Sequence, residues 1–273
     1  MKILFVIDIL DTHNNGTSIS AQRFAKELER CGHEVRVLCA NPQETDEKGV
    51  ALPVEVTGKY NVPEFIVPLF DSLIKKHGFA YGDFLPRSRP IIREAVEWAD
   101  VVHSYFPFPL EMVASNYAAK IGKPNTGAFH VQPENITMSL HCGKVQWVQN
   151  MLYRLFRNTF YYKYRHIHVP SAFMGRMLEE RDYKAKIHVI SNGIQDAFME
   201  AGENKIDNGR PPKLPEYQDK IVIMMVGRLA KEKRQDVIIN AVNYSKYANR
   251  IQLVFAGKGP QYEKYVKLSE KLA

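Results

Sequence analysis

Apolar runs alternate with helical patterns along most of this chain. Residues 3–10 form a near-continuous apolar run, which is typical of a central strand in a parallel sheet. The apolar spacing after this run predicts a helix that Thr17 or Ser18 caps and that Gly32 ends. A strand is predicted next at residues 34–40, so the chain begins with a βαβ unit.

The alternation continues as far as Ser191. Further strands are predicted at residues 50–57, 100–105, 126–131, 166–170 and 187–191. Helices are predicted at residues 90–98, with Ser88 as the cap, and at 110–121, 144–165 and 172–181. Prolines and glycines interrupt residues 61–89, which receive no assignment. This order of elements predicts an α/β fold with a doubly wound sheet and helices on both of its faces.

Residues 202–218 break this pattern. They are rich in Gly, Pro and Asn, which indicates a linker between a domain at 1–201 and a second domain at 219–273. The second domain is predicted to have strands at 221–226 and 251–256, and helices at 235–247 and from Gln261. A two-stranded sheet exposes an apolar face and an edge, so we expect this domain to be incomplete. Either the chain is truncated, or the first domain or a partner covers that face.

The strand at 221–226 is expected to be buried on both faces, and it leads directly into a cluster of cations. It ends at Gly227 and Arg228, and further basic residues follow, among them Lys233. Ligands of α/β sheets bind outside the carboxyl ends of the strands, where the next helix presents its N–H groups. Arg228 and Lys233 are therefore candidates for binding a diphosphate, and the alternative is a solvated charged loop.

Three glycines stand at other turns where a phosphate could approach the backbone. Gly257 and Gly259 follow the strand at 251–256, on the same edge of the sheet as Arg228. Gly16 lies between the first strand and its helix, where the backbone could come close to a phosphate; a simple loop glycine is the alternative. This first loop lacks the GxGxxG pattern, which disfavours a NAD-dependent oxidoreductase.

His103 and His130 each stand at the carboxyl end of a predicted strand of the first domain. A histidine there could act as an acid, a base or a hydrogen-bond donor to a substrate, although a strand histidine is also commonly a hydrogen-bonded core residue. The chain has no HExxH motif, no Cys/His metal spacing and no Walker lysine, so neither a metal site nor P-loop chemistry is predicted. Its 3 cysteines are scattered, which predicts reduced thiols in a cytoplasmic protein.

Composition adds a preference for anionic partners. The 273 residues are 45% hydrophobic and 25% charged, and their formal net charge is +7. No apolar run reaches the length of a membrane span, so we expect a soluble or peripheral protein.

The helix predicted at 144–165 carries much of the positive charge, because no Asp or Glu occurs between Glu134 and Glu179. Its spacing predicts a core stripe that includes Met151 and Leu155, and a basic face of Arg154, Arg157, Tyr161 and Arg165. Such a face suits an anionic membrane surface, and a solvated basic face is the alternative. No nucleic-acid motif accompanies the charge, so nucleic acid is not an expected partner.

Several short motifs follow one another along the whole chain. They are the loop at Gly16, DVVH at 100–103, FH at 129–130, VISNGI at 189–194, VGRL at 226–229 with Lys233, and AGKGP at 256–260. Together they resemble the retaining glycosyltransferases of family 4. The resemblance implies a GT-B fold, in which two Rossmann-like domains face each other across a cleft. The second domain would bind a nucleotide-sugar donor, and the first would hold the acceptor.

The resemblance also implies roles for individual residues. Arg228 and Lys233 would bind the donor diphosphate and stabilise its charge as it leaves, with no metal and no cofactor. Gly16 would bring the backbone of the first domain to the same diphosphate. His130 would lie near the transferred sugar, which makes it a candidate catalytic residue with Arg228 and Lys233, and His103 would lie near the acceptor.

Gly257 and Gly259 complete the candidate donor-binding residues.

Two features depart from the family pattern. The first loop has Asn15 and Gly16 where the family often has two glycines. The paired glutamates that grip the donor in the family are absent and would lie beyond Ala273. We therefore expect weak or no transferase activity from the chain as it stands.

Three functional hypotheses remain. The first is a glycosyltransferase that transfers a sugar from a nucleotide-sugar to a lipid or glycan acceptor with retention of configuration, at the cytoplasmic face of a membrane. The second is a non-catalytic fragment that binds a nucleotide or an acceptor, or that pairs with a partner. A sugar-nucleotide epimerase, which shares the architecture, is a less favoured third.

Overall fold

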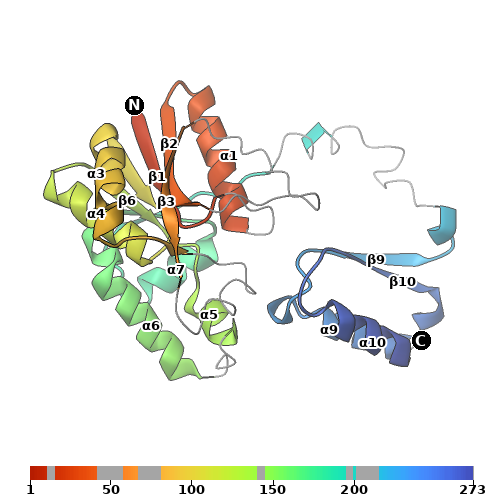
Figure 1. Cartoon of the computed structure of the whole chain (residues 1–273). Helices are drawn as coiled ribbons and strands as arrows, with labels where there is room; N and C mark the ends of the chain where they lie inside the picture. The colour runs from red at the N-terminus through yellow and green to blue at the C-terminus, as the bar shows by residue number, and fades with distance from the viewer. Residues whose placement is uncertain are drawn as a thin grey trace. The chain divides into compact units, whose positions relative to one another are not determined.

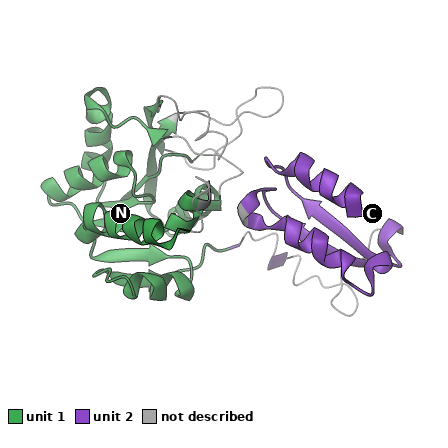
Figure 2. Cartoon of the chain, turned by 90° about the horizontal axis from the view of Figure 1, so that it is seen from below, with its two compact units in different colours: residues 1–193 green, residues 194–273 purple. Residues whose placement is uncertain are grey.

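The computed structural model describes residues 1–10, 16–41, 58–66, 81–139, 145–194, 199–200 and 215–272. The chain forms two compact units, Met1–Gly193 and Ile194–Ala273, which Figure 2 shows in green and purple. The strand predicted at 50–57 and most of the predicted linker lie outside the described residues.

The first unit is built on an eight-stranded sheet with the order β4-β3-β2-β1-β5-β6-β7-β8. All neighbouring strands are parallel except β3 and β4. The direction in which the chain adds strands reverses at β1, which lies between β2 and β5. The strands are β1 (Lys2–Val6), β2 (Glu34–Asn41), β3 (Gly58–Phe65), β4 (Tyr81–Gly82), β5 (Val101–Ser104), β6 (Asn125–Ala128), β7 (His166–Val169) and β8 (Lys186–Val189).

Helices cover both faces of this sheet, as Figure 1 shows for α1 on one side and α3 and α4 on the other. Successive side chains of β1 point into different cores: Phe5 packs on the α1 side, and Leu4 and Val6 pack on the α3 and α4 side. The predicted doubly wound architecture is therefore confirmed for this unit. The helices are α1 (Gly16–Arg30), α3 (Arg89–Trp98), α4 (Pro109–Lys120), α5 (Pro133–Ser139), α6 (Gln146–Thr159) and α7 (Ala172–Glu179).

Two predicted helix starts are wrong in detail. Helix α1 already begins at Gly16, so Ser18 is inside the helix, and its hydroxyl donates to the Ile9 carbonyl at 2.7 Å. Ser88 does precede α3, but its hydroxyl bonds Asp83 in place of a helix N–H group. In both places the serine side chain ties its helix to the strand region before it.

The long helix predicted at 144–165 is shorter in the structure. Helix α6 ends at Thr159, and a 3-10 turn at Tyr161–Lys163 follows. This break allows Phe160, Tyr161 and Tyr164 to enter one core, where they pack as a cluster of ring contacts.

The second unit pairs β9 (Ile221–Val226) with β10 (Ile251–Ala256) in parallel. Its helices α9 (Gln235–Asn243) and α10 (Tyr262–Leu272) lie together beside these strands (Figure 1). The expectation that β9 is buried on both faces is wrong, because Met224 is 60% and Val226 is 74% exposed. The cause is that the core of the described part of this unit draws on β10, through Leu253 and Phe255, more than on β9.

The turns that follow β9 and β10 touch backbone to backbone. A Cβ atom on Gly257 would lie 2.0 Å from the Gly227 carbonyl oxygen, and one on Gly259 would lie 2.3 Å from the Leu229 carbonyl oxygen. The Gly227 N–H donates to Ala256 O at 2.9 Å, and the Leu229 N–H donates to Lys258 O at 2.9 Å. Glycine is therefore required at 257 and 259 by this close approach alone.

A pair of carboxyl groups is buried beyond the carboxyl end of β1. Asp8 and Glu111 are both fully buried, and one oxygen of Asp8 accepts the Gly82 N–H at 2.5 Å. Burial raises the pKa of Asp8 to about 6, although the hydrogen bond from the Gly82 N–H opposes the shift. Burial and the charge of Asp8 also raise the pKa of Glu111. The two groups are therefore expected to share a proton.

We expect Glu111→Gln to reduce the pH dependence of stability. A carboxyl whose pKa is higher in the folded state stabilises the fold at low pH, and this contribution is lost as the pH rises through about 4 to 6 for Asp8 and higher for Glu111. The wild type should lose unfolding free energy as the pH rises from 5 to 8, and the variant should lose less, because one of the two titrating groups is gone. Urea unfolding followed by circular dichroism at both pH values measures this. Glu94→Gln, at an exposed position of α3, is the matched control, and equal slopes in all three proteins would contradict the prediction.

We expect Gly257→Ala to destabilise the second unit by about 2–4 kcal/mol, because the added methyl group would overlap the Gly227 carbonyl. The matched control is Gly16→Ala, since a Cβ atom there meets no atom within 4 Å. Hydrogen exchange of the β9 and β10 amides measures the effect locally. Wild-type exchange rates in Gly257→Ala would show that the two turns are not held in contact.

Candidate functional site

The two predicted histidines of the first unit lie at one edge of its sheet. His103 is the third residue of β5, and His130 lies two residues after the end of β6. Both strands are parallel to β1, so their carboxyl ends point to the same edge. The structure therefore brings the two side chains to the part of an α/β sheet where ligands commonly bind.

His103 is held by its neighbour on β6. Its Nδ1 atom lies 2.7 Å from the hydroxyl of Thr126, which is its register partner across the two strands. Its ring also packs edge-on against Tyr105 at 5.0 Å between centroids. Burial, followed by repulsion from His168 and His130, lowers the pKa of His103 to about 3. His103 is therefore neutral at physiological pH.

His130 is held mainly by ring contacts. It stacks on Tyr105 with centroids 5.6 Å apart and an angle of 23° between the rings. Its Nε2 atom is buried and has no hydrogen-bond partner among the described residues. Burial is the main cause that lowers the pKa of His130 to about 3. The side chain therefore offers a neutral imidazole nitrogen that a ligand could use.

A third imidazole, which the sequence does not single out, joins this group. His168 on β7 contacts the His130 ring edge-to-face at 5.4 Å and lies 6.3 Å from the His103 ring. It alternates with Ile167 and Val169, which pack into the core on the opposite face of the sheet. In the sequence, only this alternation and the nearby strand ends of His103 and His130 point to a position of His168 beside the two other histidines. No sequence motif marks the residue.

Gly16 is the first residue of α1. The loop before it, which includes Asn15, lies outside the described residues. Gly16 is exposed, and the first N–H groups of a helix lack partners within the helix. The α1 start is thus suited to an anion. On the same helix, Arg23 donates to the Gly193 carbonyl at 3.0 Å, which fixes the SNG segment against the first unit.

The predicted diphosphate residues stand on the turn after β9. Arg228 is held by its backbone, since its carbonyl accepts the Gln235 side-chain amide at 3.1 Å. The buried Leu229 and Ala230 anchor the turn, and Lys233 is exposed on the short 3-10 helix at Lys231–Lys233. Helix α9 begins two residues after Lys233. The structure therefore combines two cations with a helix N-terminus, and Gly257 and Gly259 hold the neighbouring turn against it.

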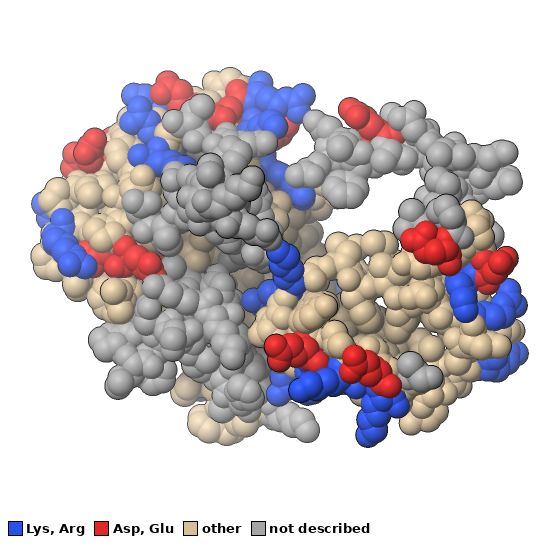
Figure 3. Space-filling model, turned by 45° about the vertical axis from the view of Figure 1, so that its right-hand side comes forward, with Lys and Arg blue, Asp and Glu red and all other residues tan. Residues whose placement is uncertain are grey.

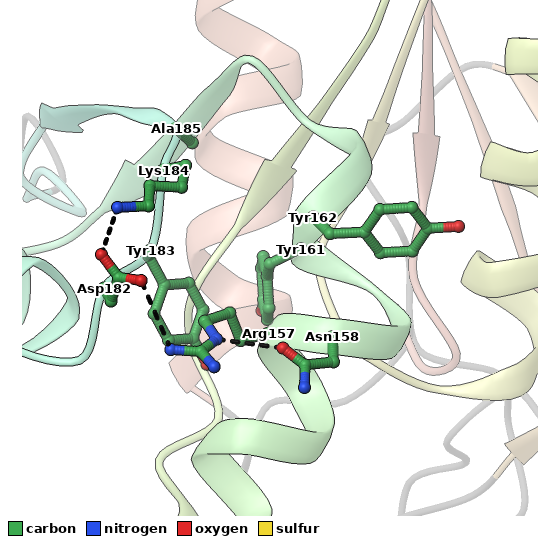
Figure 4. Close-up of a pocket in the computed structure, with 8 residues that line it drawn as sticks. All are labelled: Arg157, Asn158, Tyr161, Tyr162, Asp182, Tyr183, Lys184 and Ala185. Carbon is green, nitrogen blue, oxygen red and sulfur yellow. Dashed lines mark hydrogen bonds and ion pairs between the residues drawn. The ribbon is translucent and has the colours of Figure 1, made fainter.

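The basic face predicted on the helix at 144–165 does not form. Arg157 donates to the Arg181 carbonyl at 2.9 Å and lies 3.9 Å from Asp182, while Tyr161 is buried. These groups line a cavity of about 270 Å³ at the end of α6, where Asp182 also pairs with Lys184 (Figure 4). The cavity's cations are thus already paired, and it is separate from the predicted site residues.

The exposed face of α6 is apolar. The sequence placed Met151 and Leu155 in the core, but they are 51% and 49% exposed, and Trp147 is 68% exposed. The buried positions are Gln149, Tyr153 and Phe156. The three exposed residues are spaced by four, so they form one stripe along the solvent side of the helix.

On the face drawn in Figure 3, charge is mixed rather than gathered among the residues shown in colour. Basic side chains stand there in small groups with acidic ones beside them. Within the part of the chain that the structure describes, no group of three or more His, Cys, Asp or Glu side chains is placed to bind a metal ion.

Similar folds occur among solved structures. Sucrose-phosphate synthase from Thermosynechococcus elongatus is 14% identical with a TM-score of 0.61, and the match covers 99% of this chain and 67% of that protein. TarM is 13% identical with a TM-score of 0.61, with 99% and 74% covered. A putative UDP-N-acetylglucosamine 2-epimerase from Listeria monocytogenes is 12% identical with a TM-score of 0.51, with 99% and 66% covered. The fold is therefore of the GT-B class, and the chain spans about two thirds of the length of these proteins.

Family models match both parts of the sequence, although no curated protein matches it significantly. Residues 209–273 match the model of glycosyl transferases group 1. Residues 14–198 match the model of glycosyltransferase family 4. Because this second match spans more than half of the chain, the protein belongs to glycosyltransferase family 4.

Proposed function

We propose that this protein is a glycosyltransferase, which transfers a sugar from a nucleoside diphosphate sugar to a lipid or glycan acceptor and retains the configuration of the sugar. The observation that carries the proposal is the double turn after β9 and β10. There, Arg228 and Lys233 stand beside the start of α9 at the carboxyl edge of a parallel sheet. Family membership is the second support.

The chemistry that we propose at this turn is electrostatic. When the bond between the sugar and the diphosphate breaks, negative charge develops on the leaving phosphate. The Arg228 guanidinium can bind two phosphate oxygens at once, and Lys233 supplies a point charge. Fixed positive groups that meet charge as it develops lower the barrier, because they need no rearrangement during the reaction. The N–H groups of α9 would add to this stabilisation.

On the first unit, we assign His130 to the transferred sugar and His103 to the acceptor, and Gly16 to the donor diphosphate. The free Nε2 atom of His130 supports the first assignment, because a neutral imidazole nitrogen can donate to or accept from a sugar hydroxyl. His103 already uses Nδ1 with Thr126, so its contact with an acceptor would use Nε2. Gly16 would act through its backbone N–H at the start of α1.

We expect Arg228→Ala and Lys233→Ala each to weaken binding of UDP or GDP about tenfold or more, since a hydrogen bond to a charged group contributes about 1.5–3 kcal/mol. Calorimetry with both nucleotides measures this. Lys231→Ala is the matched control, because Lys231 is an exposed cation of the same short helix, and its affinity should stay within about twofold of the wild type. Equal losses in all three variants would indicate a diffuse charge effect in place of a diphosphate site.

The same preparations separate the rival functions. NMR of the product from an α-configured donor should show an α-linked product if the protein is a retaining transferase. Nucleotide binding that Arg228→Ala abolishes, without any sugar transfer or donor hydrolysis, would support a non-catalytic binding protein. Conversion of the donor into its epimer would support the third hypothesis.

We further propose that α6 attaches the protein to the cytoplasmic surface of a membrane. Among the residues that the structure describes, no helix has both the length and the apolar character needed to cross a bilayer. The stripe of Trp147, Met151 and Leu155 could enter the boundary between headgroups and acyl chains, where tryptophan is favoured. Arg154 and Arg165 are exposed and could contact anionic headgroups, each adding about 1 kcal/mol.

We expect Trp147→Ala with Leu155→Ala to reduce co-sedimentation with vesicles that contain anionic lipid by about tenfold or more, because two large apolar side chains leave the contact. The matched control is Phe173→Ala on α7, which removes another apolar side chain that is 62% exposed. The Trp147 fluorescence of a Trp98→Phe protein should also shift to the blue on vesicles. Unchanged sedimentation of the double variant would exclude α6 as the contact.

A further inference from the structure

We propose that His168 is a positioning residue that holds the His130 ring in the orientation required to contact the transferred sugar. The expected effect on the reaction rate rests on the proposed transferase function. The contacts of His168 with His130 lie within the first unit and do not depend on that function. His168 lies beside both predicted histidines and contributes no atom that the proposed reaction uses directly.

The orientation of His168 is fixed by a hydrogen bond. Its Nε2 atom lies 2.8 Å from the carbonyl oxygen of Ile190. Because a carbonyl can only accept, the Nε2 atom must carry the proton, which sets the tautomer of the neutral ring. The acceptor is itself fixed, since the Ile190 N–H donates to Val169 O at 3.0 Å and so extends the pairing of β8 with β7.

The ring of His168 transmits this orientation through its packing. Phe24 of α1 meets it edge-on, with centroids 5.3 Å apart and an angle of 82°. His130 meets it at 5.4 Å and 76°. Rings in such edge-to-face contact resist rotation, because turning one of them brings it into collision with the other or opens a void.

His130 is consequently held between two rings, Tyr105 on its flat face and His168 at a steep angle. None of its contacts in the described residues uses its buried Nε2 atom. The surroundings therefore fix the plane of the imidazole and leave one nitrogen for a ligand. Small errors in the position of such a group are costly in an enzyme, since a misplacement of about 1 Å can reduce the rate by about 100-fold.

A purely structural role for His168 is the rival explanation. Burying an imidazole costs free energy that an apolar side chain would not cost, and the hydrogen bond to Ile190 offsets part of it. If packing were the whole role, replacement by another ring should leave His130 undisturbed. Two variants separate the contributions: His168→Phe keeps a ring and loses the donor, and His168→Gln keeps a donor and loses the ring.

The test compares both variants in the wild-type and His130→Ala backgrounds. Long-range ¹H–¹⁵N NMR of labelled histidines reports the tautomer and environment of His130 without any need for activity. Donor hydrolysis, measured over a set of UDP-, GDP- and ADP-sugars, reports kcat and KM without a known acceptor. His166→Phe is the matched control, because His166 lies two residues earlier on β7 and is exposed.

We expect both His168 variants to shift the His130 signals and to lower kcat about tenfold or more with little change in KM. Neither should lower kcat further once His130 is alanine, and His166→Phe should leave kcat within about twofold. Unshifted His130 signals in the folded variants would overturn the proposal. So would equal losses of kcat in both backgrounds. If the wild type acts on no nucleotide-sugar, the transferase proposal fails, whereas the NMR comparison still decides whether His168 orients His130.

Discussion

Two-sided burial of β1 is the constraint on which the first unit depends. Phe5 enters the core under α1, while Leu4 and Val6 enter the core under α3 and α4, so helices must cover both faces. A parallel sheet covered in this way needs a helical crossover between successive strands, and these crossovers share one hand. Every parallel strand then ends at the same edge. His103, His130 and His168 meet there because of this topology, although 65 residues of sequence separate the first from the last.

The parts of the fold that were predictable are those with a strong local pattern. Strands such as β1, β2 and β5 could be found because strands buried on both faces are nearly continuous apolar runs. The parallel strand β3 was missed, since it lies mostly in the stretch that received no assignment and only one of its residues is buried. Helix α6 was located correctly but its faces were not, since Tyr153 and Gln149 are buried and Met151 and Leu155 are exposed. A prediction from periodicity places apolar residues on the buried face of a helix, but α6 has apolar residues on its exposed face. The burial of β9 was overestimated for the same reason, because an apolar run does not reveal what covers it.

The candidate site shows a similar division. Arg228, Lys233, His103 and His130 could be singled out because each follows or ends a predicted strand, where α/β proteins bind ligands. His168 was missed, because its alternation with Ile167 and Val169 indicates which face of the strand it lies on but not which side chains it contacts. The glycines at 257 and 259 were predicted for a ligand, yet the crowding of the Gly227 and Leu229 carbonyls already requires them. Sequence spacing thus identified the positions but not the physical reason for each residue.

That crowding also links the parts of the second unit mechanically. No side chain separates the turn at 227–229 from the turn at 257–259, and backbone hydrogen bonds join them directly. The Gln235 side chain ties the first turn to the start of α9, and the Gln261 N–H ties it to the start of α10 at 3.0 Å. The two turns and the two helix starts therefore behave as one rigid body. A displacement of the Arg228 backbone would be passed on to α10 through these hydrogen bonds and through Leu229, which shares a core with Tyr265 of α10.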